Sequence, residues 1–174
     1  MDVWPEGIAL ATSSRAWIFP EARVIFTKSF GQEATLEDAN GLVDFFLWLE
    51  TMEGPDAMPR TPPPIVVHDW RSFARVPTET RRTFIRRRAE IKTMPAKLVL
   101  ALSVDPVLRM ALRTVALASQ LVTRAVKLEL VDDPVDALEG AGVTAPDALL
   151  HLRLRDAWGA RAEGPPRKTA RPPA

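Results

Sequence analysis

The amino-acid sequence predicts a single α/β domain whose mixed β-sheet has antiparallel strands at the N-terminus and parallel strands after them. The first thirty residues contain short apolar stretches separated by turn residues, which is typical of antiparallel strands. From residue 65 onward, a strand-like stretch is followed by a helix-like stretch three times, which is typical of parallel strands joined by right-handed crossovers. A chain of 174 residues, 47% of them apolar, is long enough for one hydrophobic core and too short for two.

The antiparallel strands are expected in GIALAT, AWIF and ARVIFTKSF, with a turn at Pro20-Glu21 between the last two. A helix is expected over TLEDANGLVDFFLWLETM, residues 35–52, because its apolar residues recur at helical spacing. Thr35 and Asp38 have the spacing of a capping box at its start. The proline-rich residues that follow, up to residue 64, are expected to form a loop.

The parallel strands are expected at residues 65–69, 96–103 and 126–131, and the helices at 77–92, after Asp105-Pro106 and after Asp133-Pro134. Aspartate followed by proline favours a helix start, because aspartate accepts free backbone N–H groups and proline lacks the donor that would stay unused. We expect one domain over residues 1–158, with its core at 6–143 and a last helical segment at 146–158. Residues 159–174 are expected to form a disordered, basic, proline-rich tail.

Charge and composition exclude several classes of function. The formal net charge is +1, so no global field attracts nucleic acid or an anionic membrane. Cysteine is absent, which excludes disulfides and thiolate metal sites and fits a cytoplasmic protein. The longest apolar stretch, residues 106–122, is interrupted by Arg109 and Arg113 and is shorter than the roughly 20 residues of a membrane span. No membrane span is therefore expected.

Five arginines occupy residues 81–88 of the helix expected at 77–92, and a helical projection divides them into two groups. The apolar side of this projection holds Phe84, Ile85 and Ile91. Three arginines project to the opposite side, which we expect to be solvated: Arg82, Arg86 and Arg87. Glu90 is placed to pair with the last two. Because no aromatic residue or known binding motif accompanies this charge, nucleic acid is not expected as a partner.

Arg81 and Arg88 lie seven residues apart on the apolar side of the same helix. One interpretation is that their stems cover apolar surface while the guanidinium groups reach solvent or pair with a carboxylate. The other is that both border a cleft and bind an anion, because the guanidinium fork matches phosphate and carboxylate geometry. The sequence leaves both interpretations open.

Residues that could support catalysis have structural explanations. Aspartates are expected at the carboxyl ends of the parallel strands, where open α/β sheets place ligands: Asp69, Asp105 and Asp132 or Asp133. Helix capping accounts for two of them, so no metal site is expected. His68 and His151 lie among apolar residues, and the sequence contains no G-x-S-x-G, G-x-G-x-x-G or P-loop motif. We therefore expect neither an enzyme nor a cofactor.

The order of the elements and several strings resemble the STAS superfamily, and more closely its SpoIIAA-like bacterial members. The strings cover about residues 6–143: GQEATLEDA, IVVHDWRSFARVPTETRR, LVLALSVDPVLRMALRTVALASQ and VKLELVDDPVDAL. The resemblance implies a mixed sheet of four to five strands with helices packed on it, no cofactor, and a regulatory role through binding of another protein.

In anti-sigma-factor antagonists of this superfamily, a serine or threonine at the start of the second helix is phosphorylated to release the partner protein. The resemblance places Ser72, Thr78 and Thr80 near this position, although this chain lacks the adjacent glycine of the family motif. We therefore expect a protein partner to bind through the loop and N-terminus of the helix at 77–92. Phosphorylation and a homodimer both stay open.

A second interpretation belongs to a different class of function. An anionic or lipid-like small molecule would bind beside the same helix, with Arg81 and Arg88 as anchors. A second branch of similar folds resembles CRAL-TRIO lipid-transfer domains, and this resemblance supports the small-molecule interpretation. A third interpretation is weak nucleic-acid binding by the solvated arginines. An apolar cavity beside the helix would favour the small molecule, whereas a filled core with a protruding loop would favour the protein partner.

Overall fold

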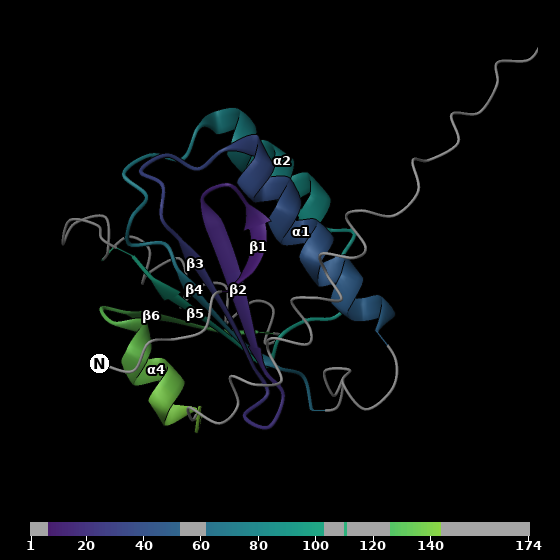
Figure 1. The fold of residues 1–174 in the computed structure, drawn as a ribbon, viewed down its shortest axis with the longest axis vertical. Helices are drawn as coiled ribbons and strands as arrows, with labels where there is room; N and C mark the ends of the chain where they lie inside the picture. Colours follow the sequence, from purple (N-terminus) through teal and green to yellow (C-terminus); the bar gives the residue numbers. More distant parts are fainter. Residues whose placement is uncertain (1–6, 53–61, 103–109, 111–125, 144–174) are drawn as a thin grey trace, which may run out of the picture.

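Six β-strands lie in sequence order across one mixed sheet in the computed structural model, which describes residues 7–52, 62–102, 110 and 126–143 (Figure 1). The described strands are β1 (Ile8–Ala11), β2 (Ser14–Phe19), β3 (Val24–Ser29), β4 (Ile65–Asp69), β5 (Lys97–Ala101) and β6 (Lys127–Val131). The first three pair antiparallel, and β3 to β6 pair parallel. The predicted mixed sheet is confirmed, and so is the parallel order of its last three strands.

Local sequence signals determine where several elements begin and end. The turn between β2 and β3 places Arg23 at a positive φ of 55° and closes with a 3.1 Å hydrogen bond from its N–H to the Pro20 carbonyl. Helix α1 (Leu36–Thr51) begins with the predicted capping box of Thr35 and Asp38. Helix α4 (Pro134–Gly140) begins where Asp133 accepts the Val135 N–H.

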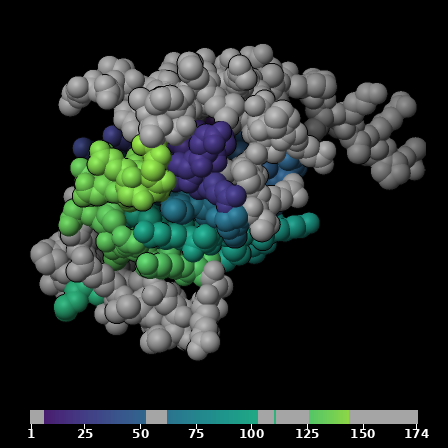
Figure 2. Space-filling view, turned by 90° about the horizontal axis from the view of Figure 1, so that it is seen from below, coloured from purple at the N-terminus to yellow at the C-terminus, as the bar shows by residue number. Residues whose placement is uncertain are grey.

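Alternation along the strands divides the core between the two faces of the sheet. Helices α1 and α2 (Thr78–Arg88) lie side by side over one face, and α4 covers the other (Figure 1). The α1 face buries Ile8, Leu10, Ala16, Ile18, Ile25, Phe45, Trp48 and Val66. The α4 face buries Trp17, Phe19, Val24, Phe26, Val67, Val99 and Leu138. Figure 2 shows α4, in green, next to purple atoms of the N-terminal strands.

Close approach of α1 to the sheet depends on Gly41. A Cβ atom at this position would lie 2.0 Å from the Leu10 carbonyl oxygen of β1, nearer than any real side chain can stand. Glycine in the middle of a helix costs about 1 kcal/mol relative to alanine. The backbone of α1 therefore packs directly on β1.

Several expectations need correction or fall outside the described residues. The sheet has six strands rather than four or five. Helix α2 ends at Arg88, four residues earlier than predicted. Apart from Met110, the helix expected after Asp105 lies outside the described residues, and so do the helix expected at 146–158 and the tail at 159–174. Among the residues that are described, no helix is long and apolar enough to cross a membrane.

Candidate functional site

A cavity of about 550 Å³ opens between α1, α2 and the carboxyl ends of the parallel strands. Eleven of the eighteen described residues that line it are apolar, including Leu42 of α1, Phe84 of α2 and Leu100 of β5. Open α/β sheets place ligands outside the carboxyl ends of their strands, and ligand pockets are mostly apolar with a few polar groups. Position, size and lining together make this cavity the candidate site.

Two crossover segments are hydrogen-bonded to each other beside the cavity. The Ala34 N–H donates to the Arg75 carbonyl at 3.0 Å, and the Ala74 N–H donates to the Gln32 carbonyl at 2.7 Å. An exposed ion pair of 3.6 Å joins Arg75 to Glu33. The segment that leads into α1 is thereby tied to the segment that leads into α2, and Ala34, Ala74 and Arg75 all line the cavity.

Aromatic side chains form one wall of the cavity around Trp70. The Trp70 ring stacks on His68, with 4.9 Å between ring centroids, and meets the edge of Phe84 at 6.4 Å. His68 is buried and bonded through Nδ1 to the Thr27 hydroxyl at 2.5 Å. Burial and the nearby Arg88 charge lower the pKa of His68 to about 3, so the imidazole is neutral near pH 7. A neutral buried imidazole supports the wall and does not act as a cationic anchor.

Asp38 and Ser14 are polar residues in the lining that stand apart from the aromatic wall. Asp38 accepts hydrogen bonds from the Thr35 N–H at 2.9 Å and from the Ser13 hydroxyl at 2.8 Å. Burial alone would raise the pKa of Asp38, but hydrogen bonds from Thr35, Ser13 and Ser14 outweigh it and lower the pKa below its usual value. Asp38 is therefore a buried, ionised carboxylate.

Arg81 lines the cavity from the second turn of its helix, and its side chain is exposed. Within the described part of the chain, its guanidinium has no ion pair and no hydrogen bond. The N-cap residue of α2, Pro77, provides no side-chain acceptor for the N–H groups of the first turn. Free N–H groups at the positive end of a helix dipole and an unpaired guanidinium attract the same kind of group, an anion.

The other residues predicted for the site are placed differently. Thr78 is exposed at the start of α2, whereas the Ser72 hydroxyl donates to the Ser29 carbonyl. Thr80 is 6% exposed, and its hydroxyl donates to the Ala34 carbonyl at 3.2 Å, so it ties α2 to the segment before α1. Arg88 does not line the cavity, because it donates to the Ile91 carbonyl and to Met94. The two arginines predicted as joint anchors are not brought together.

The predicted faces of α2 are wrong at two residues. Ile85, expected on the apolar side, is 64% exposed. Arg87, expected in solvent, is half-buried against α1, where it donates to Asp44 at 2.8 Å and to Asn40 at 3.0 Å. Thr80 and Phe84 face inward with Arg87, so the side of α2 that contacts α1 is more polar than the helical projection indicates.

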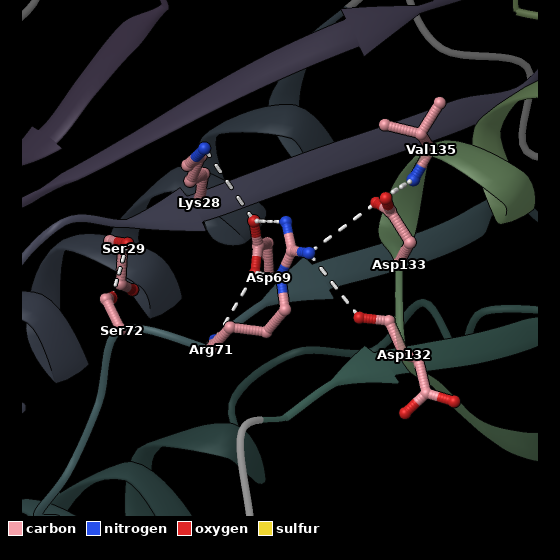
Figure 3. A network of polar contacts seen from close by, with 8 residues as sticks. All are labelled: Lys28, Ser29, Asp69, Arg71, Ser72, Asp132, Asp133 and Val135. Carbon is pink, nitrogen blue, oxygen red and sulfur yellow. Dashed lines mark hydrogen bonds and ion pairs between the residues drawn. The ribbon is translucent and has the colours of Figure 1, made fainter.

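A second polar cluster lies on the α4 side of the sheet (Figure 3). Asp69, which is 2% exposed, accepts hydrogen bonds from Arg71 and lies 3.9 Å from Lys28. Arg71 also contacts the Asp132 carbonyl and Asp133, and hydrogen bonds to Asp69 raise the pKa of its guanidinium. The cluster joins β3, β4 and the start of α4, and its charged side chains pair with one another. The described residues contain no group of acidic and histidine side chains arranged to hold a metal ion.

Sequence reasoning missed Ser14, Asp38 and Trp70 as lining residues. Ser14 points to the same face of β2 as Ala16 and Ile18, so its position at the end of an apolar face could have indicated that it is buried. Asp38 was explained by its capping role, which the structure confirms, and nothing local indicates that it also lines a cavity. Comparisons of the chain with family models, with curated proteins and with solved structures found no match.

Proposed function

We propose that this protein binds an amphiphilic small molecule whose apolar body fills the cavity and whose anionic group contacts Arg81 and the start of α2. One observation carries the proposal: a largely apolar cavity of about 550 Å³ is lined by Arg81, whose guanidinium has no partner among the described residues. That volume falls within the usual range for ligand pockets, about 300–1,000 Å³. An apolar cavity beside this helix is also the feature that distinguishes a small molecule from a protein partner.

Arg81 in the cavity lining should favour an anionic ligand over a neutral one. Arg81 has no carboxylate partner within the described residues, so a ligand anion would not compete with an existing ion pair. A hydrogen bond to a charged group contributes about 1.5–3 kcal/mol, which is roughly tenfold to hundredfold in affinity. A neutral ligand of equal length should therefore bind more weakly than the anion.

The test compares decanoate with 1-decanol by isothermal titration calorimetry on the full chain. We expect decanoate to bind more tightly, and Arg81→Gln to weaken decanoate binding at least tenfold while changing 1-decanol binding little. Arg82→Gln is the matched control, because Arg82 is an exposed neighbour that does not line the cavity. Equal effects of the two substitutions, or no binding of either ligand, would refute the proposal.

A second candidate function is docking of a protein partner at the same end of the molecule, as the STAS-like resemblance implies. Val76 is 50% exposed directly before α2, and Thr78 is exposed beside it, so an accessible apolar and polar surface lies there. Ala39→Phe separates the two candidates, because it would fill the cavity from α1, whereas the exposed Thr78 lies outside the cavity lining. A protein partner captured equally well by the wild-type chain and by Ala39→Phe, with decanoate binding lost, would favour docking of a protein.

A further inference from the structure

Asp38 accepts several hydrogen bonds but has no cationic partner among the described residues. Its Oδ2 atom takes contacts from the Thr35 N–H, the Thr35 hydroxyl and Ser13, whereas Oδ1 takes one from the Ser13 hydroxyl at 2.8 Å. The side chain is 7% exposed, and no lysine or arginine pairs with it within the described residues. An ionised carboxylate without a cation thus lines the cavity.

Ser14 provides a second acceptor next to this carboxylate. It is 5% exposed and lines the cavity, and its Oγ makes no hydrogen bond of regular geometry within the described part of the chain. Its hydroxyl nevertheless lies near enough to Asp38 to help lower the pKa of that carboxyl, which directs the hydroxyl proton toward Asp38. The lone pairs of Ser14 Oγ therefore have no donor within the described residues. A buried hydroxyl without a full set of partners costs stability unless something else bonds to it.

We propose that Ser14 and Asp38 bind a protonated amine of the ligand, so that the ligand carries an ammonium group as well as an anionic group and an apolar body. Ser14 Oγ presents an acceptor, which selects a donor, and the neighbouring carboxylate, which has no cationic partner among the described residues, favours a cationic donor over a hydroxyl. This inference rests on the proposed function, because Ser14 and Asp38 line the same cavity as Arg81. Helix capping explains why Asp38 is present, but it leaves the Ser14 hydroxyl unexplained.

The test uses amino acids whose amine stands at different distances from the carboxylate. The probes are 2-aminodecanoate, 8-aminooctanoate, 10-aminodecanoate and 12-aminododecanoate, each compared by calorimetry with the acid of the same length without the amine. A charged amine without a partner in an apolar cavity would be strongly disfavoured. We therefore expect at least one amino acid to bind as tightly as, or more tightly than, its parent acid.

Ser14→Ala isolates the amine contact, because it removes a hydroxyl that makes no regular hydrogen bond. Its affinity for the preferred amino acid should drop about tenfold relative to its affinity for the parent acid. Ser72→Ala is the matched control, since Ser72 is bonded to the Ser29 carbonyl and does not line the cavity. This control should lower the melting temperature and leave the preference unchanged.

The outcomes separate this inference from the proposed function. Weaker binding of every amino acid than of its parent acid, or an equal loss for both classes in Ser14→Ala, would overturn the amine contact while leaving the amphiphile proposal intact. Failure of decanoate and of all the amino acids to bind would overturn both. Amino-acid binding that depends on Ser14 but not on Arg81 would retain the amine contact and overturn the anion contact.

Discussion

Acid should destabilise this protein through His68 at pH values where most carboxylates are still ionised. His68 is 5% exposed, stacks on Trp70 and shares a hydrogen bond with Thr27 under the cavity wall. Burial, helped by the nearby Arg88 charge, lowers the pKa of His68 from 6.5 to about 3. The folded protein therefore excludes a proton that the unfolded chain binds.

The magnitude follows from the two pKa values. A folded-state pKa below the unfolded value means that the stability is present above pH 6.5 and is lost as the pH falls toward 3. Between these limits the free energy of unfolding falls by about 1.4 kcal/mol for each pH unit. From pH 7 to pH 5 the loss from His68 is therefore about 2 kcal/mol.

Urea unfolding at pH 7, 6 and 5 measures this loss, with His68→Asn as the comparison. Asparagine places an amide near the Nδ1 position, so it can bond to Thr27 but cannot take up a proton in this range. The variant will be less stable at pH 7, because it leaves space beside Trp70. Its stability should nevertheless fall by about 2 kcal/mol less than that of the wild-type chain between pH 7 and pH 5. An equal fall in both proteins would refute the reasoning.

Two further predictions concern the packing that shapes the site. Gly41→Ala should destabilise the protein by about 1–3 kcal/mol, because its Cβ would clash with the β1 backbone. Denaturant unfolding tests this against Gly140→Ala, whose Cβ would meet nothing within 4 Å. Thr80→Glu should cost about 2–4 kcal/mol, since it buries a carboxylate and leaves the Ala34 carbonyl without its donor. Thr78→Glu, at an exposed first helical residue, should change the free energy of unfolding by no more than about 1 kcal/mol in the favourable direction. Equal melting temperatures for the last two variants would contradict this distinction.

Features that depend on neighbours in the sequence could be predicted. The Thr35 and Asp38 capping box and the Asp133 helix cap each involve residues within three positions, and both are present. The strand after residue 65 was recognisable because IVVHD is a short apolar run that follows prolines. The parallel pairing of the last three strands also followed, since crossovers between parallel strands usually place consecutive strands side by side.

The orientation of α2 could not be predicted, because it depends on α1. A projection based on apolar residues alone assigned Ile85 to the core, yet α1 presents Asp44 and Asn40, which bind Arg87 instead. The polar contacts between α1 and Arg87 therefore hold α2 in a different orientation from the one that would bury its apolar residues best. The rotation moves Arg88 out of the lining and leaves Arg81 within it.

The cavity itself arises from strand parity together with this rotation. Lys28 and Asp69 point to the α4 face, where they pair with each other and with Arg71. Their neighbours Thr27 and His68 point to the opposite face, beneath α1 and α2. Charges at the carboxyl ends of β3 and β4 are thus neutralised on one face, while the other face keeps an apolar space with a few polar groups in its lining. The ionic cluster contacts the start of α4, whereas the cavity lies on the opposite face, between α1 and α2.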